Sequence, residues 1–276
     1  MTSDPERENA PAGVDFTRPH TARMYDYLLG GKDHFAIDRE TMQAGIKSWP
    51  GVGVYARENR KFLARAVEYL TAEAGIRQFL DIGTGLPSAN NVHEVAQRIA
   101  PDARVCYVDN DPLVLAHARA LLTSDPAGRT AYIEADLREP GKILAHPTVR
   151  DILDLSQPVA LMLVAILHFI SDEDDPGGIV STLMSALAPG SYLVCSHVTP
   201  EIDPDSMHAI VQNYRDGGIW AGARTASEFG RLFFDGLELV PPGVVLITDW
   251  RPAPGELRPP DNEVMANGAV GRKPRP

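Results

Sequence analysis

The chain has 276 residues, of which 44% are hydrophobic and 23% are charged, an ordinary composition for one large globular domain. These proportions exclude bulk disorder and a fibrous protein. The formal net charge is -11 and no cluster of basic residues offsets it, so nucleic acid is not an expected partner.

Two cysteines, Cys106 and Cys195, each lie inside an apolar run, which is typical of buried thiols and not of a disulfide framework or a zinc site. Together with the lack of a signal peptide, this predicts a cytoplasmic protein. The longest apolar run, Pro158–Ile170, is shorter than the ~20 residues that span a bilayer. It predicts a strand buried on both faces, and no membrane or metal partner is expected.

The N-terminal quarter divides into two parts. Residues 1–19 are polar, proline-rich and without periodicity, and they predict a flexible arm. Residues 20–74 carry a helical pattern, with a short first helix that stops at Gly30-Gly31 and further helices over 38–48 and 50–73. We expect residues 20–74 to form a helical lid.

The sequence pattern changes after Gly75, where short apolar runs begin to alternate with helical stretches. Residues 75–276 therefore predict a second part of the chain with an α/β fold. Pro112 and Pro176 suit the first turn of a helix, where no amide donor is needed. Alternation of strands with helices predicts a parallel sheet with right-handed crossovers. The expected strands are 77–83, 103–109, 130–136, 158–167 and 191–197, the helices are 88–100, 112–124 and 176–188, and two closing strands, antiparallel to each other, lie in 237–250 and 264–274.

The most informative segment is FLDIGTGLPSANN, residues 79–91. A strand there ends at Asp81, glycines follow at Gly83 and Gly85, and a helix is expected to begin near Pro87. Glycines permit close approach of a ligand to the backbone, and a helix N-terminus offers free amide donors. A plain strand-to-helix turn is the alternative for this segment taken alone.

Acids also stand at the ends of the next two expected strands. Asp109 follows Gly85 by 24 residues and could accept both ribose hydroxyls of an adenosine. Asp136 could accept from an exocyclic amine, and His168 ends the fourth expected strand beside the same crevice. Each acid alone could cap a turn, but together they predict an adenosine site at the carboxyl ends of the strands.

Two other nucleotide ligands fit less well. The dinucleotide fingerprint requires a third small residue, but Ser88 stands there and Pro87 removes an amide donor. This disfavours a nicotinamide-dependent oxidoreductase. Gly31-Lys32 is followed by Asp33, so a Walker phosphate loop is absent and ATP hydrolysis is not expected.

Four segments, ARMYDYLLGGKDHFAIDRE, FLDIGTGLPSANNVHEVAQ, VDNDPLVLAHARALL and LHFISDEDDP, carry a family resemblance. The chain resembles the class I S-adenosylmethionine-dependent methyltransferases and, over roughly residues 17–274, an actinobacterial family of S-adenosyl methyltransferase-like proteins of undefined substrate. The resemblance implies a Rossmann-like, seven-stranded, mostly parallel sheet with helices on both faces, and S-adenosylmethionine as cofactor.

The resemblance also implies roles for individual residues. Asp81 would lie at the methionine end of the cofactor, Asp109 would hold the ribose with Asn110 beside the adenine, and Ala165 would line the floor near the sulfonium. Arg23 or Lys32 could meet the carboxylate. The implied cofactor-binding residues are Arg23, Tyr25, Gly30, Lys32, Asp81, Gly83, Gly85, Asp109, Asn110, Asp136, Leu137, Ala165 and His168.

The expected function is methyl transfer from S-adenosylmethionine to oxygen or nitrogen of a small or medium organic acceptor, in a pocket formed by residues 20–74 and the loop 213–224. A general base is useful only for a hydroxyl or amine acceptor, and His168, then His197, is the expected base. For each of these two histidines, the alternative is a structural one: its ring makes its hydrogen bonds within its own loop and takes no part in catalysis. A non-catalytic protein that binds S-adenosylmethionine as a sensor remains open.

Overall fold

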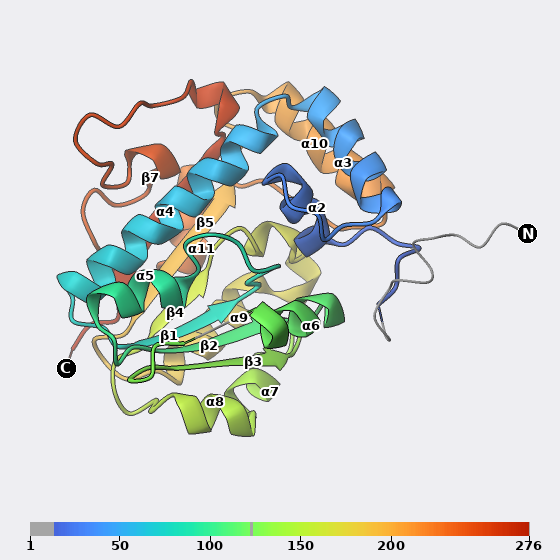
Figure 1. Ribbon diagram of the computed structural model, residues 1–276. Coiled ribbons are helices and arrows are strands. Elements are labelled where there is room, and N and C mark those ends of the chain that lie inside the picture. The colour runs from blue at the N-terminus through green and yellow to red at the C-terminus, as the bar shows by residue number, and fades with distance from the viewer. Residues whose placement is uncertain (1–13, 122–123, 276) are drawn as a thin grey trace, which may run out of the picture.

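The computed structural model describes residues 14–121 and 124–275, so most of the expected arm, residues 1–13, lies outside the described residues. The described chain folds around one eight-stranded, mostly parallel sheet with helices on both faces (Figure 1). The α/β class predicted from the sequence is confirmed. No helix of the described ranges has both the length and the apolar character that crossing a membrane requires.

The strand order is β3-β2-β1-β4-β5-β8-β6, with β7 paired to β8. The chain therefore runs outward from β1 to β3, returns across β1 and continues in the other direction from β4. The parallel strands are β1 (Gln78–Ile82), β2 (Arg104–Asp109), β3 (Arg129–Glu134), β4 (Ala160–Leu163) and β5 (Tyr192–Val198), and the antiparallel ones are β6 (Glu238–Leu239), β7 (Val245–Leu246) and β8 (Ala266–Arg272).

Both faces of the sheet are buried, which explains why its central strands read as continuous apolar runs. Successive side chains of a strand point to opposite faces. Phe79 accordingly belongs to a core with Phe62 of α4 (Val52–Ala72), whereas Leu80 belongs to a second core with Leu183 of α9 (Pro176–Ser185). The first core lies under α4 (Val52–Ala72) and α5 (Val92–Ile99), and the second under α7 (Pro140–Ala145), α8 (Pro147–Ile152), α9 (Pro176–Ser185) and α11 (Ala226–Phe233).

Three helices gather beyond the carboxyl ends of the strands (Figure 1). They are α2 (Thr21–Leu28), α3 (Ala36–Ser48) and α10 (Pro204–Asp216), and α3 packs directly on α10. Asp38 fixes the start of both N-terminal helices, since its carboxylate accepts from the backbone N–H of His20 and of Phe35, at 2.9 Å each. Gly30, with φ of 80°, ends α2 as expected. The remaining long helix, α6 (Pro112–Leu121), packs on β2 and β3.

Several expected boundaries are wrong. The helix expected near Pro87 begins at Val92, because Asn91 and Glu94 form a capping box there. The fourth strand ends at Leu163, since Ala165 adopts φ of 58°, which a strand does not allow. The segment 237–250 holds two short strands and a 3₁₀ turn over Ile247–Asp249 instead of one strand, which raises the sheet from seven strands to eight.

Candidate functional site

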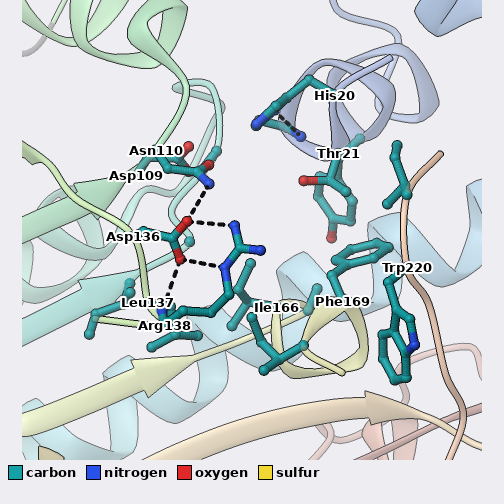
Figure 2. A pocket seen from close by; sticks show the side chains of 18 of the residues that line it. His20, Thr21, Asp109, Asn110, Asp136, Leu137, Arg138, Ile166, Phe169 and Trp220 are labelled. Carbon is teal, nitrogen blue, oxygen red and sulfur yellow. Dashed lines mark hydrogen bonds and ion pairs between the residues drawn. The ribbon is translucent and has the colours of Figure 1, made fainter. Parts of the chain in front are cut away.

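A cavity of about 890 Å³ opens at the carboxyl ends of β1, β2 and β4. It lies where the strand order reverses, at the boundary between β1 and β4, which is the general place of ligand binding in open α/β sheets. Its walls come from α2, α4, the loops after the first four strands and the loop after α10. Figure 2 shows polar side chains on one side of this space and Phe169 and Trp220 on the other.

The loop after β1 lines the cavity with two glycines, whose backbone is not covered by side chains. Gly83 and Gly85 have φ of 74° and 68°, which favours glycine at both positions. A Cβ at Gly83 would lie 2.7 Å from Cγ1 of Ile166, whereas a Cβ at Gly85 would meet no atom within 4 Å. Gly83 thus permits close packing behind the loop, and Gly85 leaves open space in the cavity in front of it.

Asp109 ends β2 and lines the cavity, with 6% of the residue exposed. Its Oδ2 accepts from the backbone N–H of Gly85 at 2.8 Å and its Oδ1 from that of Asp111 at 3.0 Å. Burial raises the pKa of this carboxyl, and the two backbone donors oppose that shift. Since a carboxylate oxygen has two lone pairs, each oxygen can accept one further hydrogen bond from a ligand hydroxyl.

Asp81 of β1 and Arg60 of α4 line the β1 end of the cavity. Burial raises the pKa of Asp81 to about 7, although the charge of Arg60 and a hydrogen bond with Thr84 act to lower it. Arg60, from α4, donates from Nη2 to the carbonyl oxygens of Ala89 and Asn90 at 3.1 and 3.0 Å. Its buried Nε has no hydrogen-bond partner among the described residues. A group with both ammonium and carboxylate ends would satisfy the two side chains.

Asp136 lies at the opposite end of the cavity, held by Arg138. Arg138 donates from Nε to Oδ1 at 2.9 Å and from Nη2 to Oδ2 at 2.6 Å, and Asn110 Nδ2 lies 3.4 Å from Oδ2 (Figure 2). Burial would raise the pKa of Asp136, but the hydrogen bonds from Arg138 outweigh it and the pKa is lowered. Leu137 adds an apolar contact for a flat ring at this end.

A buried chain of hydrogen bonds fixes the floor between these two ends. The backbone N–H of Ala165 donates to Ser196 Oγ at 2.9 Å, and Ser196 donates to Asn59 Oδ1 at 2.7 Å. Asn59 donates to the hydroxyl of Tyr25 at 3.1 Å, which in turn donates to the carbonyl of Ala56 at 2.9 Å. The chain ties α2 and α4 to the loop after β4, so this part of the wall is rigid.

Most of the residues implied by the resemblance come together here. Tyr25, Asp81, Gly83, Gly85, Asp109, Asn110, Asp136, Leu137 and Ala165 all line the cavity. Residues of the lining that the sequence did not single out include Asn59, Arg60, Thr84, Arg138 and Phe169. Asn59 and Arg60 lie in a polar stretch of α4, residues 57–61. The one feature of the sequence that could have pointed to them is that this stretch interrupts the apolar pattern of the helix.

Arg23, Gly30 and Lys32 do not line the cavity. Arg23 is 3% exposed and donates to the carbonyl oxygens of Asp15 and Arg18, at 3.0 Å each. Its Nε lies 3.3 Å from a carboxylate oxygen of Asp111, an ion pair without a hydrogen bond, so this guanidinium is directed at backbone carbonyls and Asp111 and not at the cavity. Lys32 is exposed, away from the lining.

His168 is also outside the lining, because β4 ends early and the residue falls in a 3₁₀ turn, Leu167–Phe169. It is 6% exposed, and burial, with the neighbouring His197 and Arg224, holds its pKa well below the usual range. Nε2 of His197 accepts from Arg224 at 2.8 Å and Nδ1 donates to the carbonyl of Val198 at 2.8 Å. Burial lowers the pKa of His197 to about 3, so this imidazole is neutral.

A family model described as S-adenosyl methyltransferase matches residues 7–274 of the chain. The chain belongs to the S-adenosyl methyltransferase family. It is accordingly an S-adenosylmethionine-dependent methyltransferase, as the resemblance predicted. The acidic strand ends, the open space at Gly85 and the unpartnered Nε of Arg60 fit this cofactor, which carries an adenosine and an amino acid end.

Two solved structures are similar over nearly their whole length. A DUF574-family protein of Streptomyces avermitilis is 48% identical, with 94% of this chain and 99% of that one covered and a TM-score of 0.90. A candidate methyltransferase of Thermobifida fusca is 46% identical, with 96% and 98% covered and a TM-score of 0.87. No curated protein matches the chain.

Proposed function

We propose that this methyltransferase acts on oxygen or nitrogen of a small or medium organic acceptor that enters the same cavity as the cofactor. The observation that carries the proposal is the extent of the cavity, about 890 Å³, near the upper end of the ~300–1,000 Å³ typical of small-molecule sites. It continues past Asp81, Asp109 and Asp136 to Thr21 of α2 and to the loop 218–220. The space beyond the cofactor end suits a second small molecule.

The cofactor would lie along the strand ends in one direction. Arg60 would hold its carboxylate and Asp81 its amino group, in place of the Arg23 and Lys32 expected from the sequence. Asp109 would accept from the ribose hydroxyls, and Asp136 with Leu137 would border the adenine. When bound, S-adenosylmethionine supplies a methyl group already activated by its sulfonium.

The remaining task of the protein is alignment of the acceptor atom with that methyl group. The acceptor atom gains the methyl and gives up its proton. Neither His168 nor His197 lines the cavity, and His20 is the one histidine among the described lining residues. We therefore expect alignment on the rigid floor around Ala165 to supply most of the rate, with the acceptor losing its proton to water.

A labelled-methyl experiment tests this function. The protein is incubated with deuteromethyl S-adenosylmethionine and a fractionated small-molecule extract, and products are followed by mass spectrometry. A trideuteromethyl group on oxygen or nitrogen of a small molecule is the expected result. Label found on protein or nucleic acid instead, or S-adenosylmethionine bound in calorimetry without any transfer, would contradict the proposal; the second outcome would favour a sensor.

A further inference from the structure

The half of the cavity that faces away from the adenosine end has an aromatic wall. Its rings come from three separate elements: Tyr25 from α2, Phe169 from the 3₁₀ turn after β4, and Trp220 from the loop after α10. Leu63 and Ile219 add aliphatic surface. Figure 2 shows Phe169 and Trp220 across the space from Asp109, Asn110 and Asp136. The two halves thus differ in the chemistry they offer.

The aromatic rings are held in place by their neighbours. Phe169 packs on Tyr214 with ring centroids 5.3 Å apart. The guanidinium of Arg215 lies over Trp220, 5.4 Å from the ring centroid. Gly222 makes room for the indole, since a Cβ there would lie 2.6 Å from it. Rings fixed before a ligand arrives bind it at low entropic cost.

Some of the polar groups at this end are occupied within the protein. The hydroxyl of Tyr25 bonds Ala56 and Asn59, and Asp172 pairs with Arg224. Asp174 accepts from the Ser171 hydroxyl at 2.7 Å, and Nε of Arg215 donates to the carbonyl of Ala221 at 2.9 Å. An acceptor at this end would meet carbon surface at Phe169, Trp220 and Ile219.

We propose that the methyl acceptor is a small molecule with a planar aromatic body, which lies against Phe169 and Trp220 while its nucleophilic oxygen or nitrogen faces the floor at Ala165. The inference rests on the proposed function, which leaves the acceptor class open. Aromatic rings stack in offset or edge-to-face geometry at centroid separations of ~4.5–7 Å, and such pairs contribute beyond the area they bury. A saturated ring of the same size would lose that contribution.

Trp220 provides a direct spectroscopic test, because the chain has three tryptophans and the other two, Trp49 and Trp250, are 3% and 0% exposed and lie outside the lining. The protein is labelled with 5-fluorotryptophan and saturated with S-adenosylhomocysteine. The fluorine resonance of Trp220 is assigned with Trp220→Phe. The sample is then titrated with 2-naphthol and, separately, with decahydro-2-naphthol, its saturated analogue.

We expect 2-naphthol to shift the Trp220 resonance in a saturable manner while those of Trp49 and Trp250 stay unchanged. Its affinity should exceed that of the saturated analogue by about 2- to 12-fold, the range that one aromatic pair supplies. Phe169→Leu should reduce this preference. Phe234→Leu, at a ring of the second core outside the lining, is the control and should retain it.

Equal affinities for the two probes, no shift at Trp220, or a preference unaffected by Phe169→Leu would each overturn the inference. Calorimetry with S-adenosylhomocysteine on the same sample separates the two proposals. If S-adenosylhomocysteine binds tightly but the aromatic probe is not preferred, only the inference of an aromatic acceptor is contradicted. A sample that binds no S-adenosylhomocysteine contradicts the proposed function itself.

Discussion

Asp109 carries the most easily tested role of any single residue, because its carboxylate joins the glycine loop to the cavity. Hydrogen bonds to a charged group are worth ~1.5–3 kcal/mol each. Asp109→Ala should therefore weaken binding of S-adenosylhomocysteine at least about tenfold, measured by calorimetry. The fold, followed by circular dichroism, should persist. Asp235→Ala, at an exposed acid outside the lining, is the control. Unchanged affinity in Asp109→Ala would show that the ribose does not lie at the end of β2.

Asp81 should make cofactor binding depend on pH. Its pKa of about 7 in the free protein means that the carboxyl is largely protonated at pH 6 and ionised at pH 8. Only the ionised form attracts the ammonium group of the ligand, so binding lowers the pKa and releases a proton. Affinity for S-adenosylhomocysteine should be highest above pH 7 and fall as the pH drops through 7, approaching about tenfold per pH unit.

Asp81→Asn is the matched variant for this prediction. It should bind more weakly at pH 8 and lose the dependence between pH 6 and pH 8. Calorimetry at both pH values in buffers of different ionisation enthalpy also counts the released proton. A flat profile in the unmodified protein would place the amino group of the cofactor elsewhere.

Sequence predicted the acids at the strand ends but not their supporting residues, and the difference has a physical origin. Asp81 and Asp109 directly follow short continuous apolar runs of the kind that buried parallel strands show, so their place at one edge of the sheet could be inferred. Arg60 comes from α4, which packs on the sheet face, and a polar residue on an amphipathic helix predicts only solvent exposure. Its position beside Asp81 depends on how α4 crosses β1 and α5.

At the scale of the element, the turn from β1 toward α5 can be tested through Gly85, with Gly75, which precedes β1, as the control. The two glycines have similar φ, 68° and 73°, and a Cβ at either would meet no atom within 4 Å. Alanine at each should cost a similar ~1–2 kcal/mol of stability, because left-handed backbone disfavours a side chain. Only Gly85 lines the cavity. Gly85→Ala should therefore weaken S-adenosylhomocysteine binding, and Gly75→Ala should not; equal affinities would show that the cofactor keeps away from this loop.

The elements differ in how far the sequence predicted them. The first five strands and the helices that begin at Pro112 and Pro176 were found, because buried parallel strands are apolar throughout and proline marks a first helical turn. The position of His168 was missed because β4 ends at Leu163, four residues before the end of the expected strand 158–167. The loop that precedes the 3₁₀ turn at Leu167 bonds through Ala165 to Ser196 of β5, a distant contact that no local pattern reveals.

At the scale of the whole molecule, the N-terminal segment acts as a strap over the cavity. The strap consists of residues 14–20, of which Arg18, Pro19 and His20 line the cavity. Val14 is 8% exposed and packs with Leu86 and Leu113, which lie beyond β1 and at the start of α6. Arg23 holds the strap through the carbonyl oxygens of Asp15 and Arg18. We therefore expect the strap to slow the exchange of a cofactor that lies along the strand ends.

Hydrogen exchange with and without S-adenosylmethionine tests whether the N-terminal helices form a lid. We expect new protection at Thr21–Leu28 as well as in the loop around Gly83, because a cofactor that touches both elements suppresses the openings that expose their amides. Helix α8, on the far core, should exchange at the same rate in both states. Arg23→Met should raise exchange in α2 without cofactor, since the strap then has no anchor. Protection confined to the loop around Gly83 would show that residues 20–74 only cover the sheet.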